Sequence, residues 1–565
     1  MNRKWEFYNQ DENLVQKIAK EHNISELLAV ILVNRGITQK KDIDIFLNPT
    51  RKDFHDPYSM PDMEKAVNRI LKAIDEKEKV IIYGDYDVDG ITSITVLKKF
   101  LKERGLDVGY YIPNRLDEGY GLNKDAIEKI AEEGYKLIIT VDCGISGIEE
   151  IKFAYEKGME VIVTDHHEPL EELPDALAVV DCKRKDNKYP FKNLAGCGVV
   201  FKLAQAISQR LNLDEKEYLK YLDIVCVGTI SDIVPLVDEN RVIAKLGLKL
   251  VEQTRNPGLK ALLVASGYKE VNSNTVSFGV APRINACGRM GYSYKALDLL
   301  LEEDYNKALE IASEIKEFNN QRQAEEKHIF EEANEQIKEK HLEKEDSIIL
   351  GGNSWHSGVI GIVASKITEM YFRPSILICF DDDENIGKGS GRSIPGFDLH
   401  DALMKCKDNL SGFGGHSMAV GVSVDKNNFE KFIQDFLKIA KEADISSLVP
   451  VLNIDAILNI DEITKNMIES MSELEPFGEA NPMPVFAFKG LKIASIRSLT
   501  DGKHLKLGLK SNNNTYVNAI GFNLGHFASE FKIGDKIDVA GNLEINSFNG
   551  VENIQINLKD IMKSI

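Results

Sequence analysis

The sequence lacks paired cysteines, long hydrophobic runs and an excess of positive charge. Its seven cysteines are odd in number and never form a C-x-x-C pair, so neither a disulfide framework nor a thiolate zinc site is indicated. No segment has signal-peptide character or approaches the ~18 apolar residues of a membrane span. We therefore expect a cytoplasmic protein that has no contact with a membrane.

The charge balance narrows the classes of nucleic-acid-binding protein that remain. Lysine and arginine total 70 and aspartate and glutamate total 89, which gives a formal net charge of −19. Such a chain is a poor candidate for coating nucleic acid by bulk electrostatics. An enzyme whose basic residues are confined to one cleft stays possible.

Glycine and proline are absent from residues 292 to 350, and this stretch divides the chain. Ala308, Ile311, Ile315 and Phe318 repeat there at helical spacing in a charged background, which predicts one or two long connecting helices and a domain boundary. At 565 residues the chain has room for three to five domains. A helical lead-in is predicted for the first 50 or so residues.

Short β-rich runs alternate with amphipathic stretches in the first half of the chain. The runs are KVIIY, DVGYYIP, KLIITVD, EVIVTD and LAVVD. Strands that alternate with helices predict a mostly parallel sheet covered on both faces, with ligands at the carboxyl ends of its strands.

The second half of the chain contains two further patterns. A second α/β pattern, SIILGG, PSILICF and MAVGVSV, extends to about residue 445. From about residue 484 the pattern is all-β, as in HLKLGLK, where leucines alternate with outward lysines. Five or so short strands in about 80 residues suit a small oligonucleotide/oligosaccharide-binding (OB) barrel.

Polar residues follow the early β-rich runs at positions that a metal ion could use. Residues 83–90 read YGDYDVDG, so Asp85 and Asp87 follow the first run directly. Asp142 follows a later run, Asp165, His166 and His167 the next, and Asp232 lies in CVGTISDIVPL. Like charges this close are costly unless cations lie between them. Oxygen ligands suit hard divalent cations, and an imidazole shifts the preference from Mg²⁺ toward Mn²⁺.

Each of these residues also has a purely structural interpretation. A single aspartate at a strand end is more often a helix cap or a turn former, and a His-His pair alone is weak evidence. Five such positions converging on one edge of a sheet are harder to explain in this way. Asp89 is the exception, because Gly90 and a helix follow it; we interpret it as a helix cap and leave it out of the metal-binding set.

Four motifs carry a resemblance to a known family. DYDVDG, VDCG, TDHHE and GTISDIVPL, in this order and spacing, resemble the motifs of the DHH phosphoesterase superfamily. APRINACGRM, GKGSGRS, GFGGHSMAVG and the terminal barrel resemble RecJ-type single-stranded-DNA exonucleases over nearly the whole chain. The implied fold class is α/β: a parallel-sheet DHH domain joined by a long helix to a smaller α/β DHH-associated domain, followed by a C-terminal OB-type β-barrel.

The resemblance implies a two-metal site that binds Mn²⁺ or Mg²⁺. The implied ligands are Asp85, Asp87, Asp142, His166 and Asp232. His167 would face the scissile phosphate, which completes the implied catalytic set. Some superfamily members have a histidine four residues before the first aspartate; this chain has Ile81 there, so one ion would be held less fully.

Candidate substrate-binding residues lie in three motifs. We interpret APRINACGR as a polar loop in which Arg283, Asn285 and Arg289 hold phosphate oxygens, because guanidinium forks suit them. The glycine-rich segments GSGRS and GFGGH could approach an anion through backbone N–H groups. Their candidate contacts are Ser390, Arg392, Gly414, Gly415 and His416.

The barrel supplies a candidate platform for unpaired bases. Its basic and aromatic candidates are Lys506, Lys510, Tyr516, Phe522 and Phe548. Aromatic residues at strand spacing are more often part of the core, so either role is open for each of them. The resemblance implies the barrel's role as a whole.

Together these features predict a metal-dependent exonuclease acting on single-stranded DNA. The family implies digestion from the five-prime end to mononucleotides, a role in DNA repair and recombination, and helicase and single-strand-binding partners. Alternatives are a phosphodiesterase for short oligonucleotides or cyclic dinucleotides, and a non-catalytic single-stranded-DNA-binding scaffold. The predicted domains are a helical segment (1–55), the DHH domain (56–291), a connecting helix (292–345), the DHH-associated domain (346–450) and the OB domain (451–565).

Overall fold

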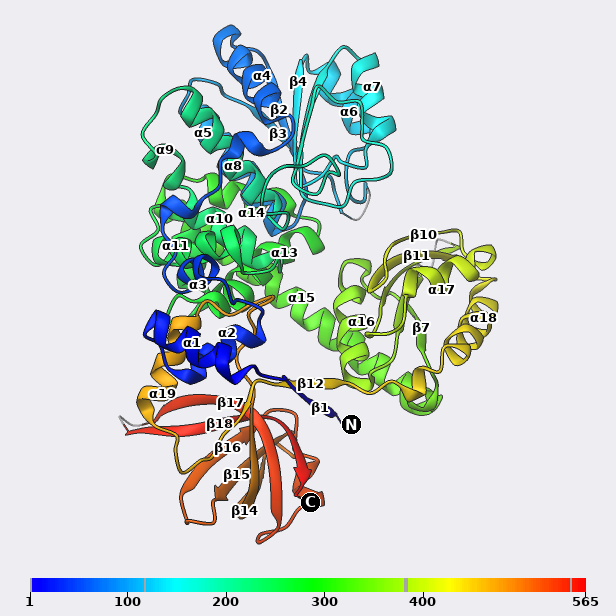
Figure 1. Ribbon diagram of the computed structural model, residues 1–565. Coiled ribbons are helices and arrows are strands. Elements are labelled where there is room, and N and C mark those ends of the chain that lie inside the picture. Colours follow the sequence, from blue (N-terminus) through cyan, green and yellow to red (C-terminus); the bar gives the residue numbers. More distant parts are fainter. Residues whose placement is uncertain (1–2, 116–117, 381–384, 549–550, 565) are drawn as a thin grey trace. The chain divides into compact units, whose positions relative to one another are not determined.

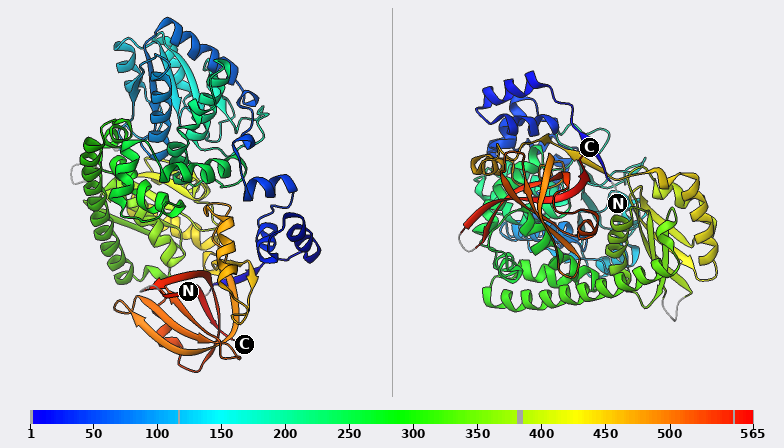
Figure 2. Two further views of the ribbon diagram at one scale, coloured as in Figure 1. Left: turned by 90° about the vertical axis from the view of Figure 1, so that its left-hand side faces the viewer. Right: turned by 90° about the horizontal axis from the view of Figure 1, so that it is seen from below.

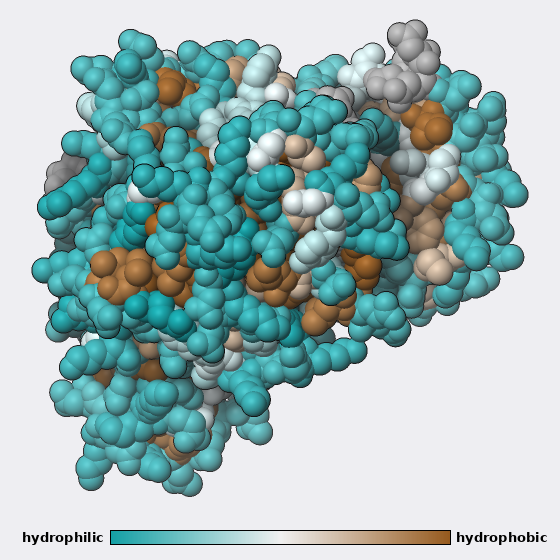
Figure 3. Space-filling view, turned by 90° about the horizontal axis from the view of Figure 1, so that it is seen from above, coloured by the Kyte–Doolittle hydropathy of each residue, from teal (hydrophilic) through white to brown (hydrophobic). Residues whose placement is uncertain are grey.

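The computed structural model describes residues 3–115, 118–380, 385–548 and 551–564, with the backbone alone at 548 and 551. The chain divides into two compact units (Figure 1). Unit 1 comprises Met1–Phe54, Pro235–Lys245 and Pro450–Ile565, and unit 2 comprises His55–Val234 and Leu246–Val449. On the face shown in Figure 3, hydrophilic residues dominate and hydrophobic residues form small separate patches.

The first sheet of unit 2 is parallel throughout. Its strand order is β3-β2-β4-β5-β6. The strands are β2 (Val80–Gly84), β3 (Gly109–Tyr111), β4 (Leu137–Val141), β5 (Glu160–Asp165) and β6 (Ala178–Asp181). β2, β4 and β6 are buried at every position, as expected for apolar strands covered on both faces. All five predicted β-rich runs are confirmed as strands.

Helices cover both faces of this sheet. On one face α6 (Lys124–Glu132) and α7 (Ile148–Glu156) share a core with the strands. On the other face α5 (Val88–Lys102) contacts β2 and β4, and α8 (Gly196–Arg210) contacts β4 and β5. Further helices of unit 2 are α4 (Met63–Glu76), α9 (Lys216–Leu219), α10 (Leu222–Ser231), α12 (Pro257–Ser266) and α14 (Ser293–Leu301). Helix α11 (Asp238–Glu252) begins in the unit 1 segment Pro235–Lys245 and ends in unit 2.

The segment APRINACGR is a helix, so its interpretation as a polar loop is wrong. It forms α13 (Ala281–Arg289) directly after a π-helical turn, Thr275–Val280. Pro282 lies in the first turn of α13, where a missing N–H group costs nothing and the fixed φ of proline suits the helix. The proline therefore marks the beginning of a helix rather than an extended run.

A 35-residue helix, α15 (Tyr305–Glu339), leads from this region into a second sheet (Figure 2). The order of that sheet is β10-β11-β9-β8-β7. The strands are β7 (Ile348–Asn353), β8 (Ser375–Phe380), β9 (Ile386–Arg392), β10 (Gly412–His416) and β11 (Ala419–Asp425), with helices α16 (Ser357–Tyr371), α17 (Leu399–Lys405) and α18 (Phe429–Glu442). The two glycine-rich segments thus lie in strands β9 and β10.

Unit 1 joins the two ends of the sequence in one hydrophobic core. The helices α1 (Glu12–His22), α2 (Glu26–Asn34) and α3 (Lys40–Leu47) share buried residues with the barrel. The remaining helices of the unit are α19 (Lys465–Ser470) and α20 (Phe527–Glu530). Strand β1 (Lys4–Phe7) pairs in parallel with β12 (Val451–Ile454), a pairing that the sequence pattern did not predict.

The barrel of unit 1 consists of five strands. They are β14 (Phe486–Leu499), β15 (His504–Lys510), β16 (Tyr516–Gly521), β17 (Lys536–Phe548) and β18 (Val551–Lys563). β14 pairs with both β15 and β17, which closes the barrel, and the short strand β13 (Ala456–Ile457) pairs with β14. This architecture is the predicted OB-type barrel.

All seven cysteines are buried and free, as the sequence predicted. Among the described residues, no helix is both long and apolar enough to span a bilayer.

Candidate metal centre and arginine cluster

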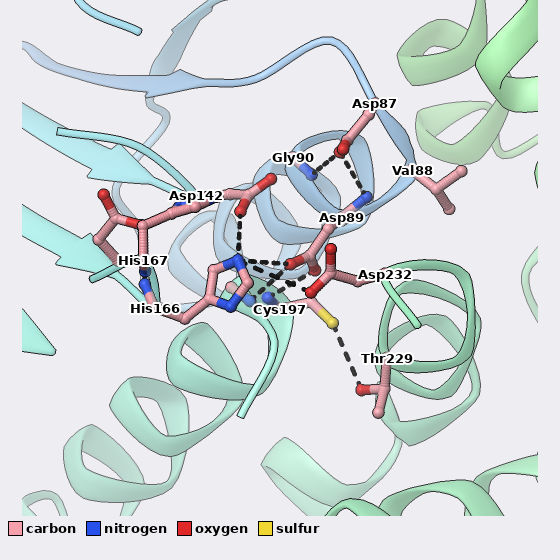
Figure 4. Close-up of polar contacts among 12 residues, drawn as sticks. Asp87, Val88, Asp89, Gly90, Asp142, His166, His167, Cys197, Thr229 and Asp232 are labelled. Atoms are coloured by element: carbon pink, nitrogen blue, oxygen red, sulfur yellow. Dashed lines mark hydrogen bonds and ion pairs between the residues drawn. The ribbon is translucent and has the colours of Figure 1, made fainter. Parts of the chain in front are cut away.

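The loop between β2 and α5 brings the first carboxylates to the sheet edge. Asp85 directly follows β2, and Asp87 is the N-cap of α5, where its Oδ1 accepts hydrogen bonds from the backbone N–H groups of Asp89 (2.9 Å) and Gly90 (3.1 Å) (Figure 4). The interpretation of Asp89 as the cap is therefore wrong. An N-cap must precede the helix, whereas Asp89 already lies in the first turn.

Asp89 instead points into the acidic site. Its carboxylate accepts hydrogen bonds from the N–H groups of Gly196 (2.5 Å) and Cys197 (2.8 Å) at the beginning of α8, and its Oδ2 lies 3.8 Å from His166 Nε2. Gly228 packs closely here, because an added Cβ would lie 2.3 Å from Thr92 Oγ1 and 3.1 Å from Asp89 Oδ1. Sequence reasoning left Asp89 out of the site because a role as a helix cap was enough to explain its position.

Three other segments complete the site. Asp142 follows β4 with a left-handed backbone (φ +59°), which aspartate tolerates better than most residues, and His166 follows β5. His166 Nε2 lies 3.1 Å from Asp142 Oδ1 and 3.7 Å from Asp232 Oδ2. Asp232 was predicted to follow a strand, but it is the C-cap of helix α10. It reaches the sheet edge from a helix end.

Without a cation, these carboxylates repel one another. Burial and neighbouring carboxylates raise the pKa values of Asp85, Asp87 and Asp142, and raise that of Asp232 to about 9. Within the described part of the chain, no lysine or arginine forms an ion pair with them. Asp85 Oδ1 and His166 Nε2 are buried with no hydrogen-bond partner among the described residues.

The donor set fits divalent cations that prefer oxygen. Three groups of side chains have their ligand atoms within 4.8 Å of one another: Asp142, His166 and His167; Asp89, His166 and Asp232; and Asp85, Asp87 and Asp142. Carboxylates with one or two imidazoles suit Mn²⁺ or Mg²⁺. Burial lowers the pKa of His166, which keeps its imidazole neutral and able to act as a ligand.

His167 lies at the rim of this site and is held by Asp165. Its Nδ1 is 2.7 Å from Asp165 Oδ1, whose carboxylate also accepts from the N–H groups of His166 and Ile145. Burial alone would lower the pKa of His167, but the Asp165 contact and the other carboxylates raise it to about 9. In the absence of metal ions the imidazole is therefore a cation at neutral pH.

An arginine cluster adjoins the first aspartate loop. Burial and, to a smaller extent, repulsion from Arg115, Arg322 and Arg392 lower the pKa of Arg289 to about 9. Burial and Arg115 also lower the pKa of Arg392, whose Nη1 donates to Ser390 Oγ at 2.9 Å. The structure thus brings together the predicted residues Arg289, Ser390 and Arg392.

Arg115 and Arg322 were missed by sequence reasoning. The Arg115 guanidinium lies 5.0 Å from the centre of the Tyr86 ring. Tyr86 is the residue between Asp85 and Asp87 in the sequence. Arg322 lies on α15 and bonds Glu326 and Asn319. Arg115 follows β3 at the same sheet edge as the aspartates, so the strand-end rule that located those residues could also have found it.

Glycines allow the elements of this cluster to approach closely. An added Cβ at Gly288 of α13 would lie 2.9 Å from the Tyr86 carbonyl oxygen. One at Gly358 of α16 would lie 2.4 Å from the Arg289 carbonyl oxygen, and Arg289 Nη1 donates to Gly358 O at 2.9 Å. Side chains at either position would push α13 away from its neighbours.

Other predicted substrate contacts have different surroundings. Arg283 donates to the backbone carbonyls of Gly279 and Ala265, so its guanidinium braces the turn before α13. Asn285 is half-buried on α13. Gly414, Gly415 and His416 are exposed on β10 and pair with β11, and within the described residues no hydrogen bond or ion pair joins them to the carboxylates.

The barrel carries a basic face on β14 and β15. In its strand register Arg497 lies opposite Lys506, and Lys492 opposite Lys510, which in turn lies opposite Tyr516. Tyr516 and Phe522 are exposed. The side chain of Phe548 lies outside the described residues.

Family models of known domains match three parts of the chain and identify the class of protein. A family model described as "DHH family, N-terminal domain" matches residues 79–229, a DHHA1 domain model matches 345–442, and a RecJ OB domain model matches 454–560. A parallel sheet with an acidic carboxyl edge, joined to a DHHA1 domain, defines a phosphoesterase of the DHH class.

Relatives identify the family. The chain is 39% identical over 561 residues to the single-stranded-DNA-specific exonuclease RecJ of Bacillus subtilis, covering 99% of this chain and 70% of that protein. It is 33% identical to RecJ of Thermus thermophilus, covering 94% and 74%. A crystal structure of Thermus thermophilus RecJ in complex with Mn²⁺ superposes with a TM-score of 0.87 at 29% identity, covering all of this chain and 80% of that one. The chain belongs to the RecJ family.

Proposed function

We propose that this protein is a metal-dependent exonuclease that hydrolyses phosphodiester bonds of single-stranded DNA. The observation that carries the proposal is the buried acidic cluster, in which carboxylate and imidazole atoms from separate segments converge without a lysine or arginine partner among the described residues. Such repulsion would only destabilise the fold unless cations lie between the carboxylates. The family relatives are named single-stranded-DNA-specific exonucleases.

The cofactors we propose are two Mn²⁺ or Mg²⁺ ions. Asp85, Asp87, Asp142, His166 and Asp232 would hold them, and we add Asp89 because its carboxylate shares the His166 and Asp232 group. When bound, the ions would activate a water molecule and neutralise phosphate charge. The Thermus thermophilus relative has crystal structures in complex with Mn²⁺ and with Mg²⁺.

The phosphate backbone would be held by the arginine cluster. Arg115, Arg289 and Arg392 are cations with few anionic partners, and a guanidinium fork donates two hydrogen bonds to a phosphate. Ser390 would add a hydroxyl contact. The imidazole of His167 would face the scissile phosphate, with Asp165 holding its other side.

Other predicted contacts have less structural support. Arg283 braces a turn, so we assign it no direct contact with phosphate. Asn285, Gly414, Gly415 and His416 remain candidates for contacts further along the strand. In the barrel, Lys506, Lys510 and Tyr516 would bind unpaired bases and phosphates, because basic and aromatic side chains together suit single strands.

The proposal also covers the polarity and products of the reaction, its cellular role and its partners. We expect digestion from the five-prime end to mononucleotides, in repair and recombination, alongside a helicase and a single-strand-binding protein. Seven free thiols agree with a reducing compartment such as the cytoplasm. We also propose the five domains predicted from the sequence, with the OB domain spanning residues 451–565 and its barrel strands beginning at β14.

The test is digestion of end-labelled DNA with Mn²⁺, Mg²⁺ or chelator. We expect mononucleotide release from single strands with either metal, none with chelator, and little release from blunt duplexes. Single strands of 5 to 60 nucleotides should all be degraded. Activity confined to the shortest substrates would favour an oligonucleotide phosphodiesterase, and binding without cleavage would favour a scaffold.

A further inference from the structure

Tyr120 is a half-exposed tyrosine at the rim of the metal centre that the function proposed above leaves unused. Its hydroxyl lies 3.1 Å from the backbone carbonyl oxygen of Asp142 and 3.2 Å from Nδ1 of His167. The Tyr120 and His167 rings meet edge to face at a centroid distance of 5.6 Å. Because 49% of its surface is exposed, the residue is not a packing element of the core.

The backbone on both sides of Tyr120 is adapted to present it. Gly119 (φ +78°) and Gly121 (φ +87°) adopt left-handed conformations that other residues rarely take. The carbonyl of Gly121 accepts a hydrogen bond from the hydroxyl of Tyr83 at 3.0 Å, and Asn123 donates to the same hydroxyl. Tyr83 is fully buried in β2, so the chain after Tyr120 is anchored to the strand that leads to Asp85.

The direction of the Tyr120 hydroxyl proton follows from its two neighbours. A phenol has one proton to donate, and the Asp142 carbonyl oxygen can only accept, so the proton points to Asp142. The phenol oxygen then turns its lone pairs toward His167. It lies 3.2 Å from Nδ1 and 3.5 Å from Nε2, so it contacts the imidazole near both nitrogens.

His167 is consequently held at two points. Asp165 Oδ1 contacts Nδ1 at 2.7 Å, and the Tyr120 oxygen contacts the ring separately, 3.2 Å from Nδ1 and 3.5 Å from Nε2. A single contact at Nδ1 would leave the imidazole free to turn about that bond. Two contacts fix its plane relative to Asp142, whose backbone carbonyl is the other partner of the Tyr120 hydroxyl.

We propose that Tyr120 is a positioning residue that orients the imidazole of His167 toward the substrate phosphate. This inference rests on the proposed function, in which His167 faces the scissile phosphate. A misplacement of about 1 Å can lower the rate of a catalysed step up to about 10²-fold, so loss of the second contact is expected to affect turnover. Binding of the DNA strand depends on other residues and is expected to be unaffected.

The test compares Tyr120→Phe with wild type in steady-state cleavage of single-stranded DNA with Mn²⁺. We expect kcat to fall about tenfold, part of the ~10²-fold cost of a misplaced group, with KM unchanged within twofold. Tyr155→Phe is the matched control, since Tyr155 is a partly exposed tyrosine on α7 outside the site, and it should behave as wild type. A wild-type kcat for Tyr120→Phe, or a loss confined to KM, would overturn the inference.

A double-mutant cycle separates positioning from a merely structural effect. In a His167→Ala background, Tyr120→Phe should cause no further loss of kcat, because the group it positions is gone. Equal fold losses in both backgrounds would contradict the inference. If His167→Ala itself retains wild-type kcat, the proposed role of His167 is wrong; if it is impaired and Tyr120→Phe is not, only the role of Tyr120 fails.

Discussion

The acidic cluster and the arginine cluster of unit 2 are opposite in sign and alike in construction. Burial and like-charged neighbours raise the pKa values of Asp142 and Asp232, and burial and like-charged neighbours lower those of Arg289 and Arg392. Each cluster is unfavourable by itself. In the function proposed above, each would be relieved by a partner of opposite charge, a divalent cation in one case and a phosphate in the other.

The two clusters differ in how they are held. Asp85, Asp142 and His166 directly follow buried parallel strands, so the sheet holds them before any ligand binds. The arginines come from a loop after β3, from α13, from α15 and from β9, and close contacts at Gly288 and Gly358 hold α13 in place. The acidic cluster is therefore held mainly by the sheet, whereas the arginine cluster depends on helix packing.

In the acidic cluster, the largest loss of activity is expected on replacement of Asp142, which takes part in two of the three candidate ligand groups. Asp142→Ala should abolish Mn²⁺-dependent cleavage, a loss of about 10³-fold or more, because metal ions contribute several kcal/mol to such reactions. Binding of single strands, measured by fluorescence anisotropy, should remain.

The control for Asp142 is Asp107→Asn, a change of an exposed carboxylate in the same domain. It should cleave at the wild-type rate. Normal cleavage by Asp142→Ala would remove Asp142 from the site.

The basic side of the comparison is tested at Arg392. Arg392→Ala should raise KM about 10- to 100-fold and make activity more sensitive to salt, since charge-assisted hydrogen bonds contribute about 1.5–3 kcal/mol. Arg392→Lys should recover part of the loss, because it restores the charge without the fork. Arg255→Ala, at an exposed arginine of the same unit, is the control. Unchanged kinetics on long and short strands would exclude Arg392 from the DNA path.

The pH dependence of the free energy of unfolding tests the electrostatics of the acidic cluster without any substrate. The pKa of Asp232 is about 9 in the metal-free fold against about 4 in an unfolded chain, so the folded state binds the proton more tightly. Stability of the metal-free protein should therefore fall as pH rises between these values, by up to about 1.4 kcal/mol per pH unit for each proton held.

Calorimetry at pH 6.5 and 8 in chelator measures this change. Added Mn²⁺ should raise the melting temperature more at pH 8, where fewer protons compete with it for the carboxylates. Asp232→Asn should flatten the dependence. A metal-free stability that rises with pH would contradict the predicted direction.

The smallest effect is expected at the barrel, which offers its basic residues on an open surface instead of a buried cluster. Tyr516→Ala should weaken binding of a 40-nucleotide strand about fivefold, corresponding to roughly 1 kcal/mol of base stacking. Binding of a five-nucleotide strand should change less. Equal binding of the long strand by variant and wild type would place Tyr516 outside the DNA path.

Much of the candidate metal centre could be predicted from the sequence because the carboxyl ends of buried strands can be recognised in it. Apolar runs followed by Asp85, Asp142 and His166 give both the strand and the edge where it ends. Asp232 was found by motif and assigned to the wrong element, because a short apolar run does not distinguish a buried helix from a strand.

The remaining features depend on packing that the sequence does not record. The orientation of Asp89 is set by the beginning of α8, more than 100 residues away in sequence. The arginine cluster draws on elements from β3 to β9, and spacing alone could not separate Arg289, which joins it, from Arg283, which binds backbone carbonyls. The helix at APRINACGR was missed because the segment was interpreted as a polar, phosphate-binding loop, and the position of Pro282 as a first-turn proline was not considered.

The most direct test of the account is anomalous diffraction from crystals soaked in Mn²⁺. We predict manganese peaks among Asp85, Asp87, Asp89, Asp142, His166 and Asp232, with ligand distances of about 2.0–2.3 Å, as for other divalent ions bound by carboxylates and imidazole. Crystals of Asp142→Ala should lose at least one peak. No peak at this edge of the sheet in wild-type crystals, with the carboxylates turned away from one another, would contradict the claim that divalent cations hold the cluster together.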